Sequence, residues 1–290
     1  MKEIIAKAET LIEALPYLQK YRDKIFVFKY GGHAMTDEKL RESFLEDIVL
    51  LKHVGIKPVI VHGGGPQIED ALKRVGLKSK YHNGLRITDS ETMDIVEMVL
   101  VGKVGSELVR EINRLGGEAV GLSGQDGRMI QAKKLAPKSA KGKSDIDLGE
   151  VGEITRIDTD LILRLCNEDR FLPVISPVGV SAEGKALNIN ADTAASEIAV
   201  ALKAEKLVFL TDVAGVLDRN SKLISTMRIG ETGKLIRNKT VHGGMVPKIE
   251  SAADAVKRGV GSVAIIDGRI DHTVLLEIFT DKGVGTLITT

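Results

Sequence analysis

The chain has 290 residues, a net charge of +1, 43% hydrophobic residues and 28% charged residues. These proportions are typical of a globular protein that buries a large core, as one large α/β unit or as two lobes. The near-neutral charge, the 3% aromatic content and the lack of Trp argue against a nucleic-acid-binding surface.

The chain contains one cysteine, Cys166. A single cysteine excludes an intrachain disulfide and is typical of a reducing compartment. Because Cys166 lies in the apolar stretch 161–166, we expect it to fill space in the core. The charged start does not resemble a signal peptide, and no apolar run is long enough to cross a bilayer. We therefore expect a cytoplasmic protein without a membrane partner.

The first predicted element is a helix over residues 3–15, where apolar residues recur at helical spacing. Pro16 should end this helix, because the residue before a proline disfavours the helical region. The helix precedes the first predicted strand, so it can cap the domain or dock a second subunit. We favour docking.

From residue 24 onwards, strands and helices alternate. Strands are predicted at 24–30, 57–62, 119–121, 129–134, 154–157, 172–177, 206–211 and 262–266, and helices at 40–53, 66–75, 90–115 with a break near Gly102, 161–167, 191–204 and 248–258. Residues 137–144 are predicted to form a hairpin tip. This alternation predicts an α/β fold with a mainly parallel sheet covered on both faces. A lobe boundary near 180–184 would set a cleft along the carboxyl ends of the strands.

The stretch 59–68 places three glycines, Gly63–Gly65, between an apolar strand and a helix that starts at Pro66. Successive backbone N–H groups there, with a helix N-terminus behind them, can bind an anion. Such a turn, taken alone, can equally well bind nothing. Neither standard nucleotide signature fits: Pro137 occupies an earlier glycine position of a Walker motif, and Ile68 replaces the last glycine of a dinucleotide fingerprint. The phosphate interpretation therefore requires several anion-binding turns to converge.

Three charged or polar positions have both a structural and a functional interpretation. Most lysines are solvated surface charges, but Lys29 lies inside an apolar strand, where a charge is costly unless paired. In the stretch 188–192, Asn190 or Asp192 can cap a helix; alternatively, the Asn amide holds a substrate and the Asp carboxylate lies among lysines. Arg86 is either a surface residue in a turn or a fork that binds a carboxylate.

Six motifs follow one another in an order that resembles the acetylglutamate kinase family of the amino acid kinase superfamily. They are Lys29-Tyr30-Gly31-Gly32, His62-Gly63-Gly64-Gly65-Pro66, Asn83-Gly84-Leu85-Arg86-Ile87-Thr88, Asn188-Ile189-Asn190-Ala191-Asp192, Leu210-Thr211-Asp212-Val213-Ala214-Gly215-Val216 and Gly243-Gly244-Met245-Val246-Pro247-Lys248. Each motif alone is weak, whereas their ordered set is specific and spans nearly the whole chain. His33, where many members have Asn or Ser, departs from the pattern and affects only the detail of the first turn.

The resemblance implies a three-layer αβα sandwich and an ATP-dependent phosphorylation of the γ-carboxylate of N-acetyl-L-glutamate, the second step of arginine biosynthesis. It divides the chain into an oligomerisation helix and linker (1–23), a lobe that binds the acyl substrate (24–180) and a lobe that binds ATP (181–290). Mg²⁺ would bind through the nucleotide, and we assign no side chain as a metal ligand.

By motif position, the resemblance assigns the site residues. The catalytic residues would be Lys29 and Lys248, which flank the transferring phosphoryl group, and Asp192, which orients both. The acyl substrate would be bound by Gly64, Gly65, Arg86 and Asn188. The nucleotide would be bound by Gly31, Gly32, Thr211, Asp212, Val213, Gly215, Val216 and Gly244.

These residue types suit the implied chemistry. A γ-carboxylate with a pKa of about 4.3 is already ionised at neutral pH, so no general base is required. The obstacle is the approach of one anion to another, which lysines, Mg²⁺ and backbone N–H groups offset.

The two ends of the chain resemble the arginine-inhibited branch of the same family, through Tyr17, His272, Glu277, Gly283 and Gly285. In that branch an extra N-terminal helix interlaces dimers into a homo-hexamer, a trimer of dimers, and L-arginine binds between this helix and the second lobe. Glu277 would pair with the guanidinium, or it is an exposed helix carboxylate. A PII-type regulator is a further candidate partner.

Other activities remain open. Related kinases act on glutamate (glutamate 5-kinase), aspartate (aspartokinase), carbamate or uridylate, and a non-catalytic arginine-binding regulator is an alternative from another class. Arg86 together with Asn188 favours an amino-acid-derived carboxylate over a nucleotide acceptor. The presence of Lys29, Lys248 and Asp192 argues against a silent regulator.

Overall fold

The computed structural model covers the whole chain and describes all residues except 83, 137–145, 169, 239, 242–244 and 282. The predicted hairpin tip at 137–144 therefore lies outside the described residues.

The fold is built on an eight-stranded, mainly parallel sheet. In spatial order its strands are β12 (Thr226–Arg228), β14 (Thr286–Thr289), β13 (Ser262–Asp267), β11 (Lys206–Thr211), β1 (Ile25–Tyr30), β2 (Lys57–His62), β8 (Leu172–Ser176) and β5 (Ala119–Ser123). All neighbours pair in parallel except β13 and β14. The apolar strands thus form the mainly parallel sheet that the alternation predicts.

Helices cover both faces of this sheet, which makes the three-layer sandwich. One face packs against α2 (Glu38–His53), α5 (Ser106–Arg114) and α10 (Thr273–Ile278), and the other against α6 (Asp160–Asn167), α7 (Ala191–Ala201) and α9 (Met245–Lys257). Strand β1 shows why both faces are apolar: Phe26 and Phe28 enter the first core, and Val27 enters the second. Lys29 follows the same alternation and shares the face of Val27.

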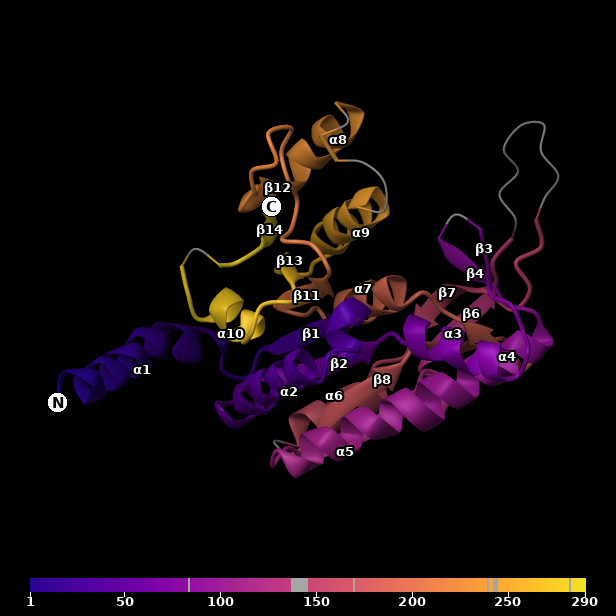
Figure 1. Cartoon of the computed structure of the whole chain (residues 1–290), viewed down its shortest axis with the longest axis horizontal. Helices are drawn as coiled ribbons and strands as arrows, with labels where there is room; N and C mark the ends of the chain where they lie inside the picture. The colour runs from indigo at the N-terminus through magenta and orange to yellow at the C-terminus, as the bar shows by residue number, and fades with distance from the viewer. Residues whose placement is uncertain (83, 137–145, 169, 239, 242–244, 282) are drawn as a thin grey trace.

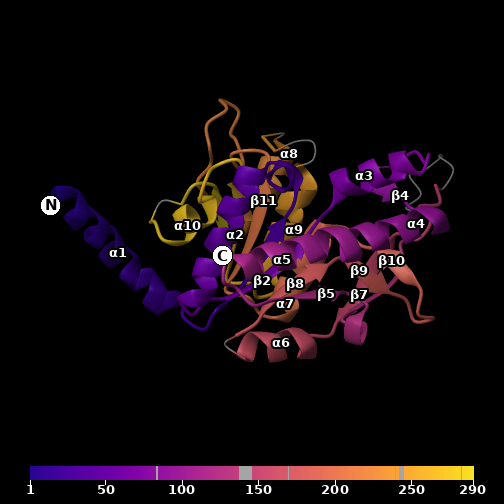
Figure 2. The ribbon, with the colours of Figure 1, turned by 60° about the horizontal axis from the view of Figure 1, so that its bottom comes forward.

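Smaller elements surround the carboxyl ends of the central strands (Figures 1 and 2). They are the four-stranded sheet of β10 (Ala186–Asn188), β9 (Val178–Val180), β6 (Ile130–Lys134) and β7 (Gly152–Ile157), the hairpin of β3 (Lys80–His82) and β4 (Leu85–Ile87), the helices α3 (Gly65–Arg74) and α8 (Ile229–Arg237), and the short 3₁₀ turns η1 (Gly32–Met35) and η3 (Asp126–Arg128). The hairpin β9–β10 crosses the expected lobe boundary near residues 180–184. The division into lobes stays a prediction.

The predicted helix 90–115 contains a π-helix instead of a break. Helix α4 (Ser90–Glu97) leads into the π-helix η2 (Met98–Gly105), which continues as α5. The wider turn keeps the three segments continuous, and it brings Leu100 against the glycine turn after β2, where a Cβ on Gly64 would lie 2.6 Å from Leu100 Cδ2. Single π-turns of this kind are frequent at functional sites.

The first helix is longer than predicted. Helix α1 (Lys2–Tyr21) contains Pro16 in its interior and ends at Tyr21, so the expectation that Pro16 ends the helix is wrong. Aromatic contacts hold the turn beyond the proline: Tyr17 packs edge-on against Phe279, and Tyr21 against Phe26. Because α1 extends away from the body of the molecule (Figures 1 and 2), the carbonyl that loses its partner to Pro16 can bind water. None of the described helices is long and apolar enough to cross a membrane.

Candidate active site

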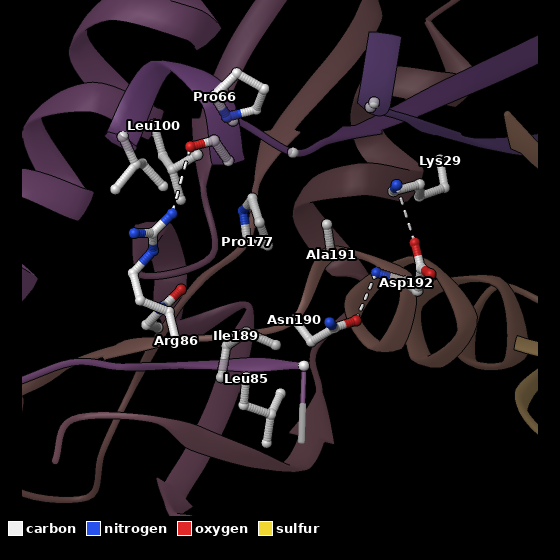
Figure 3. A pocket seen from close by; sticks show the side chains of 18 of the residues that line it. Lys29, Pro66, Leu85, Arg86, Leu100, Pro177, Ile189, Asn190, Ala191 and Asp192 are labelled. Carbon is white, nitrogen blue, oxygen red and sulfur yellow. Dashed lines mark hydrogen bonds and ion pairs between the residues drawn. The ribbon is translucent and has the colours of Figure 1, made fainter. Parts of the chain in front are cut away.

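A cavity of about 310 Å³ lies at the carboxyl ends of β1 and β2, next to the N-terminus of α7. Figure 3 shows it from close by, with Arg86 and Leu100 on one side and Lys29 and Asp192 on the other. The lining combines the two glycine turns, the β3–β4 hairpin and the segment that leads into α7. Of the predicted site residues, it includes Lys29, Gly31, Gly32, Gly64, Gly65, Arg86, Asn188 and Asp192.

Asp192, in the first turn of α7, binds lysines from two other elements. Lys29 Nζ, from β1, lies 3.0 Å from Asp192 Oδ1, and Lys248 Nζ, from α9, contacts Oδ2. Two positive charges thus share one negative charge. The structure brings these three residues together, although residues 29 and 248 are far apart in the sequence. Their catalytic roles stay predictions.

The shared carboxylate is ionised at neutral pH. Burial on its own would raise the pKa of Asp192, but the charges of Lys29 and Lys248 outweigh burial, and the pKa is lowered. Asn190 caps α7, since its Oδ1 accepts hydrogen bonds from the backbone N–H groups of Asp192 at 2.9 Å and Thr193 at 3.1 Å. The capping interpretation therefore fits Asn190, and the interpretation of a carboxylate among lysines fits Asp192.

The first glycine turn, at Gly31 and Gly32, has little room for side chains. A Cβ on Gly31 would lie 2.7 Å from Lys29 Nζ, and one on Gly32 would lie 2.7 Å from Asp212 Oδ1. Gly32 also has a φ of +73°, which side-chain-bearing residues rarely adopt. Gly65 begins α3 with Pro66 behind it, so the N-terminus of α3 is directed at the turn.

Arg86 lies in the short strand β4 and not in the expected turn, and only 7% of it is exposed. Its Nη1 lies 3.2 Å from Glu69 Oε2, and its Nη2 donates to the Gly65 carbonyl at 3.3 Å, as Figure 3 shows. Ser79 Oγ accepts a further hydrogen bond, and the ring of Tyr81 lies under the guanidinium. These contacts are inconsistent with a freely solvated surface arginine.

Asn188, at the end of β10, donates from Nδ2 to Thr88 Oγ1 at 3.0 Å. Thr88 is fully buried and directly follows β4. This hydrogen bond joins the Arg86 strand to the segment that leads into α7. The two polar residues expected to bind the acyl substrate are thus linked to one another through β4.

The segment after β11 lies beside the first glycine turn and not in the cavity wall. Thr211 Oγ1 donates to the Ile266 and Val213 carbonyls, and the Asp212 carboxylate lies against Gly32. Val216 is buried, and its N–H donates to Thr286 Oγ1 at 2.8 Å; Gly215 has a φ of +132°. Gly244 lies outside the described residues, and so does Asn83 of the third motif.

A second pocket, of about 240 Å³, lies between α1 and α10. Four of the five residues predicted for arginine line it: Tyr17, Glu277, Gly283 and Gly285. Glu277 is 6% exposed, which excludes the alternative of a surface carboxylate. Its Oε1 accepts a hydrogen bond from Lys206 Nζ at 3.1 Å.

The other contacts in this pocket are hydrogen bonds made by Glu277 and Tyr17 and the close packing of two glycines. Glu277 Oε2 accepts from the Val284 N–H at 3.2 Å, and the Tyr17 hydroxyl donates to the Asp281 carboxylate. Gly283 has a φ of +58°, and a Cβ there would lie 2.5 Å from Glu277 Oε2. A Cβ on Gly285 would lie 2.1 Å from the Ile265 carbonyl oxygen.

His272, the fifth residue of that set, is not among the described residues of the pocket lining. Its Nδ1 lies 2.7 Å from Asp47 Oδ1, and its N–H donates to Ser43 Oγ at 2.6 Å. Burial raises the pKa of Asp47 to about 6, and the hydrogen bond to Asp47 raises the pKa of His272. His272 therefore joins α10 to α2 outside the lining of this pocket.

Sequence reasoning missed three partners of the predicted residues: Glu69 and Tyr81 beside Arg86, and Lys206 beside Glu277. Lys206 carries a signal similar to that of Lys29, because it is the first residue of the apolar strand β11, where an unpaired buried charge is costly. Glu69 lies on the polar side of an amphipathic helix and carries no such signal. In the described part of the chain, no three His, Cys, Asp or Glu side chains lie close enough together to hold a metal ion.

Comparison with known sequences gives concordant matches. A sequence model of the Amino acid kinase family matches residues 24–267. The chain is 54% identical over 284 residues to the acetylglutamate kinase of Methylobacillus flagellatus, covering 98% of this chain and 96% of the relative. It is 52% identical over 297 residues to that of Aquifex aeolicus, covering 100% and 99%.

Solved structures show the same fold. The N-acetylglutamate synthase of Neisseria gonorrhoeae, complexed with coenzyme A and N-acetyl-glutamate, superposes with a TM-score of 0.85 at 27% identity, over 98% of this chain. The match spans 63% of the length of the synthase. The carbamate kinase of Giardia lamblia bound to AMP-PNP superposes with a TM-score of 0.64 at 16% identity, a likeness of fold alone.

Proposed function

Because the chain belongs to the amino acid kinase family, we propose that it transfers the γ-phosphoryl group of ATP to the γ-carboxylate of N-acetyl-L-glutamate in the cytoplasm, as the second step of arginine biosynthesis. The observation that carries this proposal is Asp192 bound to both Lys29 and Lys248 beside a glycine-lined cavity. The relatives at 51–54% identity over nearly the whole chain, which are acetylglutamate kinases, support the choice of acceptor.

The reaction needs no proton transfer. A γ-carboxylate oxygen forms a bond to the γ-phosphorus, the bond from that phosphorus to the β,γ-bridging oxygen breaks, and ADP leaves with the electron pair. The two lysines carry one charge more than Asp192 neutralises, and this surplus stabilises the negative charge on the equatorial oxygens. Asp192 keeps the two ammonium groups at a fixed separation while both ligands bind.

On the acceptor side, Arg86 and Asn188 would hold the α-carboxylate end of the substrate, and the N–H groups of Gly64 and Gly65 would hold the reacting end. Because Arg86 already contacts Glu69, the substrate carboxylate has to share or replace that contact. Glu69 is half exposed, so water can solvate it when the guanidinium turns towards the substrate.

On the nucleotide side, the turns at Gly31, Gly32 and Gly244 and the segment 211–216 would hold ATP. The glycine turns fit a polyphosphate, since a Cβ on Gly31 or Gly32 would fill the space beside Lys29 or Asp212. Mg²⁺, when bound to the phosphates, supplies further positive charge to the transferring group. This chain would meet Mg²⁺ through the nucleotide.

The second pocket would bind L-arginine as a feedback inhibitor. Glu277 would pair with the guanidinium, and Lys206 would pair with the α-carboxylate, because the pocket carries one charge of each sign. Helix α1 forms one wall of the pocket and also exposes Leu11, Ile12 and Leu15, which would pack against a second dimer in a hexameric trimer of dimers. A PII-type regulator is a further candidate partner.

The assembly is tested by deleting residues 1–16. We expect the hexamer to become a dimer, because the deletion removes the exposed side chains of Leu11, Ile12 and Leu15. Arginine inhibition should be lost as well, because the pocket-lining end of α1 loses the part of the helix that would pack against the second dimer. Light scattering coupled to size exclusion measures the mass. A truncated chain that still elutes as a hexamer contradicts the assembly.

The activity is tested by coupled ADP release with N-acetylglutamate, glutamate and aspartate as acceptors. We expect turnover with the acetylated substrate and at least about 100-fold lower kcat/KM with the other two, since a lost polar contact leaves a buried partner unpaired. Preference for free glutamate or aspartate would move the chain to another branch of the family. Arginine binding without any ADP release would favour a silent regulator.

A further inference from the structure

His62, the last residue of β2, is completely buried and lies directly before the glycine turn of the cavity. Its Nδ1 lies 2.8 Å from the Gly63 carbonyl oxygen, and its Nε2 lies 2.9 Å from Ser176 Oγ in the neighbouring strand β8. Ser176 Oγ in turn lies 3.2 Å from the Leu100 carbonyl oxygen in the π-helix η2. A continuous line of polar atoms thus runs from the glycine turn to the π-helix.

The positions of the hydrogens on His62 and Ser176 follow from the groups that these side chains contact. A carbonyl oxygen only accepts, so Nδ1 carries the hydrogen and donates to Gly63. Burial lowers the pKa of His62 to about 4, so the ring is neutral at neutral pH. Nε2 is therefore an acceptor, so the one hydrogen of the Ser176 hydroxyl faces two acceptors, His62 Nε2 and the Leu100 carbonyl oxygen.

The hydrogen bond to Gly63 fixes the direction of a substrate-facing group. In a planar trans peptide the C=O and N–H point in opposite directions, so holding the Gly63 carbonyl also directs the N–H of Gly64 away from His62. From its other side, the Gly64 Cα is packed by Leu100, whose Cδ2 would lie 2.6 Å from a Cβ. The Gly63 N–H donates to the Tyr30 carbonyl at 2.7 Å, which ties the turn to β1.

The π-helix leaves room for this line of atoms through one glycine. A Cβ on Gly105 would lie 3.2 Å from the Leu100 oxygen, 3.3 Å from Ser176 Oγ and 3.4 Å from His62 Nε2. The first two distances are shorter than ordinary van der Waals contacts, and the third lies at their lower limit. Gly102, in the same π-helix, has no such neighbours: a Cβ there would meet nothing within 4 Å.

We infer that His62, held by Ser176, is a positioning residue: it fixes the Gly63–Gly64 peptide so that the Gly64 N–H points at the acyl substrate, and the π-helix locks this arrangement through Leu100 and Gly105. This role rests on the proposed function, since it acts on the substrate contact assigned to Gly64. Residues that orient a contacting group in this way commonly contribute about 10- to 100-fold to activity.

The test compares Gly105→Ala with Gly102→Ala, which make the same change in the same π-helix. We expect Gly105→Ala to lower kcat/KM for N-acetylglutamate about 10-fold or more, with KM for ATP within about twofold of the wild type. Gly102→Ala should match the wild type. Equal kinetics in the two variants would overturn the inference. A wild type without acetylglutamate-dependent ADP release would instead defeat the proposed function.

A second pair of variants removes a serine hydroxyl without adding a larger side chain. Ser176→Ala should lower kcat/KM about 10-fold, whereas Ser123→Ala, a change at the register neighbour of Ser176 in β5, should leave it within twofold.

A third pair of variants replaces His62 itself: His62→Asn can still place an N–H near the Gly63 carbonyl, and His62→Leu cannot. We expect the Asn variant to retain about 10-fold more activity at equal thermal stability. Equal activity of the Asn and Leu variants, or of the two Ser variants, would contradict the positioning role.

Discussion

The cavity at the glycine turns and the pocket between α1 and α10 both contain a largely buried lysine beside a carboxylate, but their charges balance differently. At the cavity, the lining residue Asp192 is shared by Lys29 and Lys248, which leaves one positive charge in excess. In the second pocket, Lys206 and Glu277 form a pair of one charge each. A surplus of positive charge suits a polyanion, whereas one charge of each sign suits an amino acid, which carries both. Charge balance thus distinguishes two sites with the same residue types.

The largest effect on activity is expected when one of the two lysines is replaced, because this removes the excess positive charge beside Asp192. Lys248→Ala should lower kcat about 100- to 1,000-fold, because one donor aimed at developing charge typically contributes this much. KM for ATP should change far less, since other groups of the site hold the nucleotide. Steady-state ADP release measures both constants, and Lys29→Ala should behave alike.

The matched control for this prediction is Lys257→Ala at the end of the same helix, α9, where the side chain is exposed. Its kcat should stay within about twofold of the wild type. An unchanged kcat in Lys248→Ala or in Lys29→Ala would remove that lysine from the mechanism.

A smaller effect, on arginine inhibition alone, is expected in the pocket between α1 and α10, where the two charges balance. Glu277→Gln removes the negative member of the pair, so the concentration of arginine for half-inhibition should rise about 10-fold or more, since a hydrogen bond between charged groups is lost. Turnover without arginine should stay within about twofold, because Glu277 lies outside the cavity lining. Arginine titrations of the initial rate measure the first quantity. Unaltered inhibition would show that arginine acts elsewhere.

The elements that could be predicted from the sequence are those with strong periodicity. The apolar runs of β1, β2, β8, β11 and β13 predict their strands, and alternation with helices predicts the parallel sheet. The short strands β12 and β14, with three and four residues, lie at one side of the sheet and carry too little pattern to be found. The expectation that Pro16 ends the helix is wrong because local preference does not include the aromatic contacts made beyond the proline.

Local sequence preference does not include contacts with distant parts of the chain, and this also decides which site residues could be predicted. Lys29 is marked by its costly position inside an apolar strand. Asp192 lies at a helix start, where acidic residues are common, so its role is predicted only from the order of the motifs. Glu69 and Ser176 are ordinary residues whose importance comes from a partner far away in the chain, Arg86 or His62. The pairing of Lys206 with Glu277 joins positions 71 residues apart, and no local rule specifies it.

The smallest expected effect concerns stability beside the second pocket, where Asp47 and His272 join α2 to α10. Burial raises the pKa of Asp47 to about 6, above the usual value of 3.8, and the hydrogen bond to Asp47 raises the pKa of His272. The folded chain therefore holds more protons than the unfolded chain between about pH 4 and 7. By linkage, this contribution is present at low pH and is lost as the pH rises.

Asp47→Asn removes the buried titrating carboxyl, so it tests whether α10 is held by this pair independently of the pocket. We expect the free energy of unfolding of the wild type, relative to that of the variant, to fall by about 1–3 kcal/mol as the pH rises from 4 to 7. Urea denaturation at several pH values measures it. Asp271→Asn, the same change at the exposed carboxylate next to His272, should run parallel to the wild type. Because the Asp47–His272 pair lies outside both cavities, turnover at neutral pH should change little in either variant. Parallel stability curves for Asp47→Asn and the wild type would contradict the prediction and would show that α10 is held chiefly by Lys206 and Glu277.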